Sequence, residues 1–244
     1  MVSHVTLFPT CLVDAIAPET GMSTARVLQS IGDEVEVPEG ATCCGQPAWN
    51  AGHPKPAATV ARTTLQALSD TTGPIVVPSG SCATMITVFW PELFELAGSR
   101  SERTLAAEVA VRTVELSAYL TTRTRTVSHT DATPTVYHRS CHMLRELSIT
   151  DEPERLLAGV ATDVRPSEAQ GRCCGFGGLF SVKLPEVSTA MADEVLDAVT
   201  ATGATRVVGC DVSCLMHLAG RSSRRGLGLR FAHLAEVLDG STSS

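Results

Sequence analysis

Short apolar runs alternate with amphipathic stretches along the whole chain. In the first half, this pattern predicts strands at 4–8, 34–37 and 74–77, and helices near 23–31, 56–68, 83–96 and 104–120. In the second half, it predicts strands at 135–138, near 162–164 and at 205–208, and helices near 152–160, 186–200 and 231–238. Such an alternation favours an α/β fold, in which parallel sheets carry helices on their faces.

An internal repeat divides the chain into two copies of one unit. Cys11, Cys43 and Cys44 recur 130 residues later, and Cys82 recurs 132 residues later as Cys214. The flanking segments agree, as in TCCGQPAWNAG (42–52) and RCCGFGGLFSV (172–182). The polar segment TTRTRTVSHTDAT (121–133) joins the copies. We therefore expect two pseudo-symmetric Rossmann-like halves with parallel sheets, a first copy over 1–122 and a second over 133–244.

The cysteines follow the predicted strands. Five of them come a few residues after a strand, and each Cys-Cys-Gly turn lies in a loop after a second strand. Because ligands bind outside the carboxyl ends of strands in open α/β sheets, distant cysteines can meet at one edge. The nine cysteines form an odd number with two vicinal pairs, which suits a disulfide framework badly.

Metal binding or thiol redox chemistry remains for these thiols. Thiolates select zinc, copper(I) or iron–sulfur clusters. Structural zinc sites use short CxxC spacings, whereas 31 residues separate Cys11 from Cys43. Gly45 and Gly175 allow turns that point both adjacent thiols inward, because glycine tolerates positive φ. A polynuclear cluster therefore suits the pattern better than one tetrahedral ion, and structural zinc or inert buried thiols remain the alternative.

Composition and charge exclude several other classes of function. A content of 43% apolar and 18% charged residues is typical of a globular protein. The net charge of −7 argues against nucleic acid as a partner. No apolar run approaches the roughly 20 residues of a membrane span, and no signal peptide is evident, so we expect a cytoplasmic protein. A flavin or nicotinamide fingerprint is also missing from the sequence.

Several motifs resemble those of one known family. They are TCLVDAIAPETG, CCGQPAWNAG, PSGSCATM, YHRSCHMLRE, CCGFGGLFSVKLPEVS and DVSCLMHLAG, and they span residues 10–219. The paired C…CCG…C pattern resembles the cysteine-rich CCG domain of heterodisulfide reductases and of the iron–sulfur subunits of glycerol-3-phosphate and glycolate oxidases. The motifs are closest to the LutA/YkgE/LldE family of iron–sulfur subunits of bacterial L-lactate oxidation complexes.

The resemblance implies a redox cofactor and a set of ligands. In the family, five cysteines hold a non-cubane [4Fe–4S] cluster, and the matching positions here are Cys141, Cys173, Cys174, Cys210 and Cys214. The first copy offers Cys11, Cys43, Cys44 and Cys82 for a second cluster or zinc, since Pro78 stands opposite Cys210. We therefore expect one cluster in the second copy, while a cluster in the first copy is left open.

The resemblance also implies a function. It is electron transfer during oxidation of L-lactate to pyruvate, with a second iron–sulfur subunit and a third small subunit as partners. Two alternatives remain: a cluster that acts directly on a disulfide or another small 2-hydroxy acid, and a zinc-stabilised scaffold subunit. His138 and His142 flank Cys141 and could hydrogen-bond cluster sulfur or pack in the core. Arg145 and Lys183 are candidates for attracting a carboxylate substrate.

Overall fold

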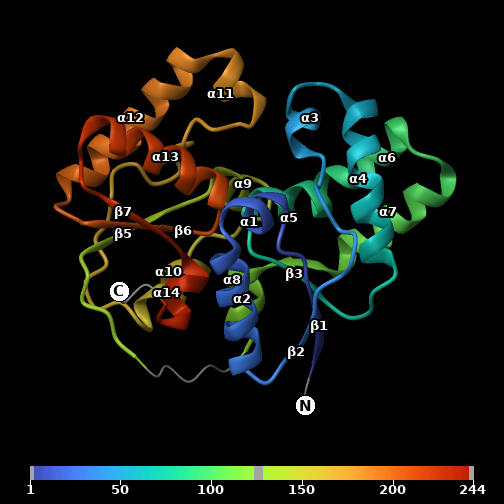
Figure 1. Cartoon of the computed structure of the whole chain (residues 1–244), viewed down its shortest axis with the longest axis horizontal. Helices are drawn as coiled ribbons and strands as arrows, with labels where there is room; N and C mark the ends of the chain where they lie inside the picture. Colours follow the sequence, from blue (N-terminus) through green and yellow to red (C-terminus); the bar gives the residue numbers. More distant parts are fainter. Residues whose placement is uncertain (1–2, 124–128, 242–244) are drawn as a thin grey trace.

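The chain folds into two parallel sheets that each carry helices. The computed structural model describes residues 3–123 and 129–241. The first sheet has the order β2 (Glu34–Glu36), β1 (His4–Leu7), β3 (Ile75–Val77) and β4 (Thr113–Glu115). The second has the order β5 (Thr135–His138), β6 (Arg206–Gly209) and β7 (Arg230–His233). Every strand pair is parallel, which confirms the predicted α/β class (Figure 1).

Helices follow nearly every strand. In the first copy they are α1 (Cys11–Ile16), α2 (Pro18–Ser30), α3 (Gln46–Asn50), α4 (Pro54–Ser69), α5 (Gly80–Thr84), the π-helical turn η1 (Met85–Phe89), α6 (Trp90–Ala97), α7 (Arg100–Arg112) and α8 (Leu116–Thr121). In the second they are α9 (Cys141–Arg145), α10 (Glu152–Ala158), α11 (Leu179–Lys183), α12 (Pro185–Ala201), α13 (Val212–Arg225) and α14 (Leu234–Asp239).

The two sheets have the same topology. In both, the first strand of the copy pairs with the strand that precedes the last cysteine, and that strand pairs with the final strand of the copy. The counterpart of β2 is reduced to isolated parallel bridges, Asp131 to Ala161 and Thr135 to Val164. The strand predicted near 162–164 is therefore only a bridge, although it lies at the expected edge.

Two of the predicted helices include residues that form a strand in the structure. The helix expected over 104–120 is interrupted by β4, and the one expected over 231–238 starts with β7. Both strands end in a residue that caps the next helix: Glu115 accepts from the backbone N of Ser117, and His233 Nδ1 accepts from that of Ala235. Strands of three or four residues followed at once by a helix leave too short a period-2 pattern to be recognised.

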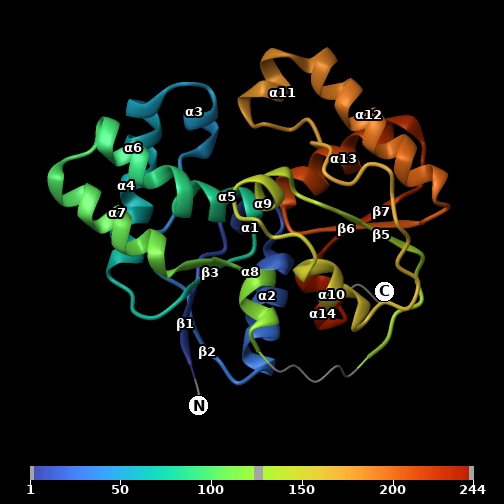
Figure 2. The same cartoon turned by 180° about the vertical axis from the view of Figure 1, so that it is seen from behind.

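The two copies share one apolar core. The last helix of the second copy, α14, packs against α2 of the first, and α8 of the first copy packs against α10 of the second (Figures 1 and 2). Val5, Leu120, Leu157, Val208 and Leu234 are buried in the same cluster. These helix contacts between the copies fix the two sheets relative to each other. The boundaries of the copies, 1–122 and 133–244, stay a prediction. Every helix in the described part of the chain is too short or too polar to cross a bilayer.

Candidate metal centre

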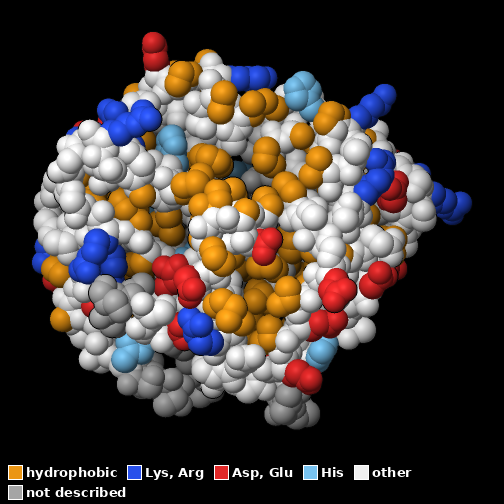
Figure 3. Space-filling model, in the orientation of Figure 1, with side chains coloured by type: hydrophobic (Ala, Val, Ile, Leu, Met, Phe, Trp, Pro, Cys, Tyr) orange, Lys and Arg blue, Asp and Glu red, His pale blue; other side chains and the backbone are white. Residues whose placement is uncertain are grey.

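A cavity between the two copies gathers eight of the nine cysteines. It measures about 180 Å³ and lies beyond the carboxyl ends of the strands of both sheets, where Figure 3 shows a hollow bordered by hydrophobic side chains. We call it the cysteine cavity. Its thiols are Cys11, Cys43, Cys44, Cys82, Cys141, Cys173, Cys174 and Cys214. The volume is below the roughly 300–1,000 Å³ of sites for drug-sized ligands, so it suits a small acid or an inorganic centre.

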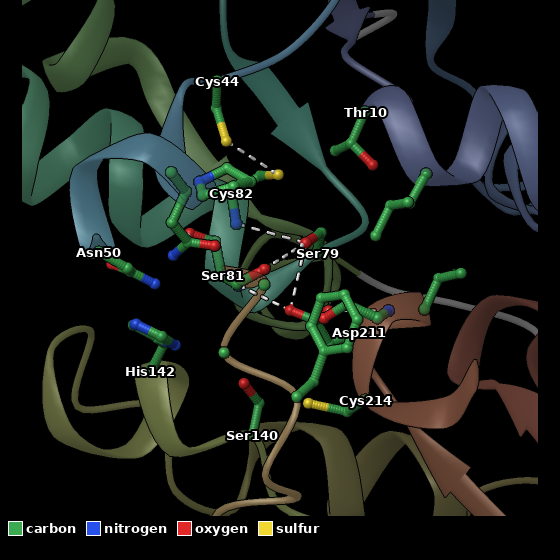
Figure 4. Close-up of a pocket in the computed structure, with 18 of the residues that line it drawn as sticks. Thr10, Cys44, Asn50, Ser79, Ser81, Cys82, Ser140, His142, Asp211 and Cys214 are labelled. Atoms are coloured by element: carbon green, nitrogen blue, oxygen red, sulfur yellow. Dashed lines mark hydrogen bonds between the residues drawn. The ribbon is translucent and has the colours of Figure 1, made fainter. Parts of the chain in front are cut away.

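Each copy contributes four cysteines from equivalent places. Cys11 and Cys141 open the helices after β1 and β5, and Cys82 and Cys214 lie in the first turns of α5 and α13. The vicinal pairs lie in the loops before Gly45 and Gly175. The Sγ atoms of Cys44 and Cys82 are 3.2 Å apart, and those of Cys174 and Cys214 are 2.9 Å apart. The two sets therefore have matching geometry (Figure 4 labels Cys44, Cys82 and Cys214).

The glycine of each Cys-Cys-Gly turn is required by both conformation and packing. Gly45 and Gly175 have φ of 86° and 88°, in the left-handed region. A Cβ at Gly45 would lie 2.7 Å from the carbonyl oxygen of Ala57, and one at Gly175 would lie 2.5 Å from that of Ser188. In each turn the glycine N–H donates to the first cysteine of the pair, at 3.4 Å. The turn thus packs the loop against α4 in the first copy and α12 in the second, with its thiols at the cavity.

We expect Gly175→Ala to destabilise the protein by about 3 kcal/mol, because the new Cβ meets both an unfavourable φ and a backbone carbonyl. Gly32→Ala is the matched control, since Gly32 also has a φ of 88° but has nothing within 4 Å of the added Cβ. It should lose only about 1–2 kcal/mol. Chemical denaturation of both variants measures the difference. Equal losses would show that the Gly175 turn accommodates a Cβ.

Hydrogen bonds between thiols set the charge of each group. The pKa of Cys173 falls to about 2 because the Cys141 and Cys174 thiols donate hydrogen bonds to its thiolate. The pKa of Cys43 falls to about 3 for the same reason, through Cys11 and Cys44. The donor thiols have raised pKa values, because they hydrogen-bond a thiolate and are buried. Complete ionisation of either set therefore needs the counter-charge of a cation.

Cys210 is the one cysteine that does not line the cavity. It is 1% exposed and lies in the shared core, where the Tyr137 hydroxyl donates to its Sγ at 3.3 Å. Burial raises the pKa of its thiol well above the ordinary value, and the nearby Glu115 carboxylate adds to the shift. The structure thus brings together four of the five cysteines that the resemblance implies for the second copy. Pro78, the counterpart of Cys210, leaves the first copy with an equivalent set of four.

His138 lies beside the thiols of the second copy. It ends β5, is 5% exposed, and its Nε2 has no hydrogen-bond partner among the residues that the structure describes. A ring nitrogen of His138 and the Sγ atoms of Cys174 and Cys214 all lie within 4.8 Å of one another, close enough to hold one metal ion. Burial lowers the pKa of His138 to about 4, so the imidazole is neutral, as metal ligands require.

Asp211 joins the two copies at the wall of the cavity. Its carboxylate caps α13 by accepting from the backbone N of Ser213, and it reaches the first copy by accepting from the backbone N of Ser81 at 2.9 Å. The hydroxyl of Ser79 donates to it at 3.3 Å (Figure 4). This link between the copies was not predicted from the sequence. A capping signal was nevertheless present, because Ser79 and Asp211 each lie three residues before the last cysteine of their copy.

The other polar side chains in the cavity carry amide, hydroxyl and imidazole groups. Figure 4 places Asn50 of the first copy and His142 of the second on the same side of the cavity. Among the described residues that line it there is no lysine or arginine. Arg145 instead points its guanidinium to the carbonyl of Gly171 at 3.5 Å, and Lys183 also lies outside the lining. The two cations suggested for a carboxylate substrate are therefore not part of this site.

Comparisons with known proteins find a cysteine-rich domain in each copy. The family model for the CCG cysteine-rich domain matches twice, over residues 5–87 and 135–219. "Lactate utilization protein A 2" of Bacillus cereus (strain Q1) is 38% identical over 242 residues, which cover 96% of this chain and 97% of that protein. "Lactate utilization protein A" of Bacillus thuringiensis (strain Al Hakam) is 39% identical over 238 residues, with 96% and 98% covered. The chain therefore belongs to the lactate utilization protein A family of CCG cysteine-rich domain proteins.

Proposed function

We propose that this chain is the iron–sulfur electron-transfer subunit of a cytoplasmic complex that oxidises L-lactate to pyruvate. The observation that carries the proposal is the convergence of eight thiols, in two matching sets, on one cavity. The relatives that match nearly the whole chain are named for lactate utilization, which supports the choice of substrate.

The donor set fits iron–sulfur clusters. Each set offers four soft ligands at the edge of a rigid sheet, and each contains two Sγ atoms about 3 Å apart. In this proposal each copy holds one cluster, through Cys11, Cys43, Cys44 and Cys82 in the first and Cys141, Cys173, Cys174 and Cys214 in the second. Such clusters supply one-electron transfer when bound, and oxidation of lactate to pyruvate releases two electrons and two protons.

The remaining residues of the cavity hold the two thiol sets in place and shape the space between them. Asp211 fixes the N-termini of α5 and α13, which carry the closing cysteines Cys82 and Cys214. Asn50 and His142 offer hydrogen-bonding groups from opposite copies. Electrons must then leave the chain, and we propose a second iron–sulfur subunit and a third small subunit as partners.

A second candidate function is direct catalysis at this cavity. The space between the thiol sets is about 180 Å³, and Asn50 and His142 can hydrogen-bond a hydroxyl group there. The substrate would then be lactate itself, another small 2-hydroxy acid or a disulfide. A zinc-stabilised scaffold subunit is the third candidate, with the same thiols as ligands.

Lactate oxidation by the purified chain, alone and with its partner subunits, separates these functions. We expect the lone chain to oxidise lactate slowly or not at all with artificial acceptors, and the assembled complex to be severalfold faster, because the electrons must pass between subunits. The measurement is acceptor reduction under anaerobic conditions. Rapid turnover by the lone chain would instead support direct catalysis at the cavity.

A further inference from the structure

The two copies carry different residues at the position three before their first cysteine. The repeat that relates Cys11 to Cys141 also relates Phe8 to His138, since each lies three residues before its cysteine. Phe8 is 1% exposed and packs in the apolar cluster of the first copy. His138 is similarly buried but brings a nitrogen to the same place in the second copy.

The buried nitrogen of His138 lacks a partner in the described structure. Leaving a buried nitrogen without a hydrogen bond costs free energy, so such a group needs an explanation. By contrast, the buried hydroxyl of the preceding residue, Tyr137, has an acceptor, because it donates to Cys210 Sγ. The thiols of Cys174 and Cys214 lie close enough to a ring nitrogen of His138 to share one metal ion with it.

Distances place a ring nitrogen of His138 where a metal ligand would lie. Within residues 3–123 and 129–241, His138, Cys174 and Cys214 are the one group of three His, Cys, Asp or Glu residues whose ligand atoms all lie within 4.8 Å of one another. His138 does not line the cysteine cavity, so it approaches these two thiols from the buried side. A cavity-bound substrate therefore leaves this position free.

We propose that the His138 imidazole is a ligand of the metal centre in the second copy, which makes that centre a mixed cysteine–histidine site and the first an all-cysteine site. This inference rests on the proposed function. The two centres then have different chemistry despite their matching thiols: one position of the second centre is closed by nitrogen, whereas Phe8 contributes no donor to the first. The repeat has thus given the chain two unequal redox centres.

Pulsed electron paramagnetic resonance of the reduced, anaerobically reconstituted full chain tests this inference. We expect a nitrogen coupling that changes when histidine is labelled with ¹⁵N, and this measurement needs no substitution. His138→Phe, which copies the residue of the first copy, should abolish the coupling while most of the iron remains. His142→Ala is the matched control and should keep the coupling, because His142 lies beside Cys141 on the cavity side.

The outcomes separate the inference from the function on which it rests. Iron and sulfide without any histidine coupling in the wild-type chain would overturn the His138 assignment and leave the proposed function standing. A coupling that survives in His138→Phe but is lost in His142→Ala would overturn it in favour of His142. If the chain holds zinc in place of iron, the proposed function fails. X-ray absorption at the zinc edge then decides the assignment, because a nitrogen neighbour that disappears in His138→Phe supports it and an all-sulfur shell contradicts it.

Discussion

Replacing Cys174 or Cys214 with serine is expected to remove the metal of the second copy, and replacing Cys44 or Cys82 is expected to remove that of the first. Each change deletes one of two Sγ atoms that lie about 3 Å apart at the base of a set. Since the sets are separate, each variant should lose about half of the iron of the chain and keep its α/β fold. Metal analysis with circular dichroism measures both.

Cys210→Ser is the control for these variants. Its thiol lies in the shared core and contacts Tyr137, away from the cavity, so the substitution should leave the iron content nearly unchanged. If Cys210→Ser lost as much iron as Cys214→Ser, the five-cysteine set implied by the family resemblance would hold and the four-cysteine set would be wrong. If variants of the first copy lost no iron, only the second copy would carry a centre.

Replacing Asp211 with alanine is expected to destabilise the protein by about 3 kcal/mol, because several buried donors would lose a charged acceptor. The backbone N–H groups of Ser81 and Ser213 and the hydroxyl of Ser79 all donate to this carboxylate, which is 2% exposed. The two copies would also lose a link at the wall of the cavity. Chemical denaturation gives the change in the free energy of unfolding.

Asp163→Ala provides a matched comparison, because Asp163 pairs with Arg165 at 2.8 Å on the surface. Exposed ion pairs contribute about 0–1 kcal/mol, so this variant should be close to the wild type. Asp211→Asn keeps an oxygen acceptor and should lose less than Asp211→Ala. An Asp211→Ala variant as stable as Asp163→Ala would show that the hydrogen bonds of Asp211 between the copies do not stabilise the protein.

The sequence predicts most of the fold because each copy is a repeated set of apolar strands separated by amphipathic helices. The strands β1, β3, β5 and β6 lie where their apolar runs indicate. The edges are harder to predict: β4 and β7 run directly into helices, and the strand near 162–164 is only a bridge. Edge strands this short depend on pairing with a neighbour, which local periodicity does not encode.

The convergence of the cysteines is also predictable, because the carboxyl ends of parallel strands meet at one edge of a sheet. The direction of individual side chains is not. Cys210 and Asp211 follow β6 in succession, and neighbouring residues of an extended chain point to opposite sides. Cys210 therefore enters the core while Asp211 reaches the cavity. The place of His138 beside the thiols likewise depends on how the last residue of β5 is oriented, and spacing alone leaves it undecided between packing and metal binding.

The central claim is that the thiols of this cavity hold iron–sulfur clusters. Its most direct test is the content of iron, acid-labile sulfide and zinc in the full chain purified without oxygen. We expect iron and sulfide in about equal amounts, with about four irons for each copy that holds a cluster. Stoichiometric zinc without sulfide would contradict the account.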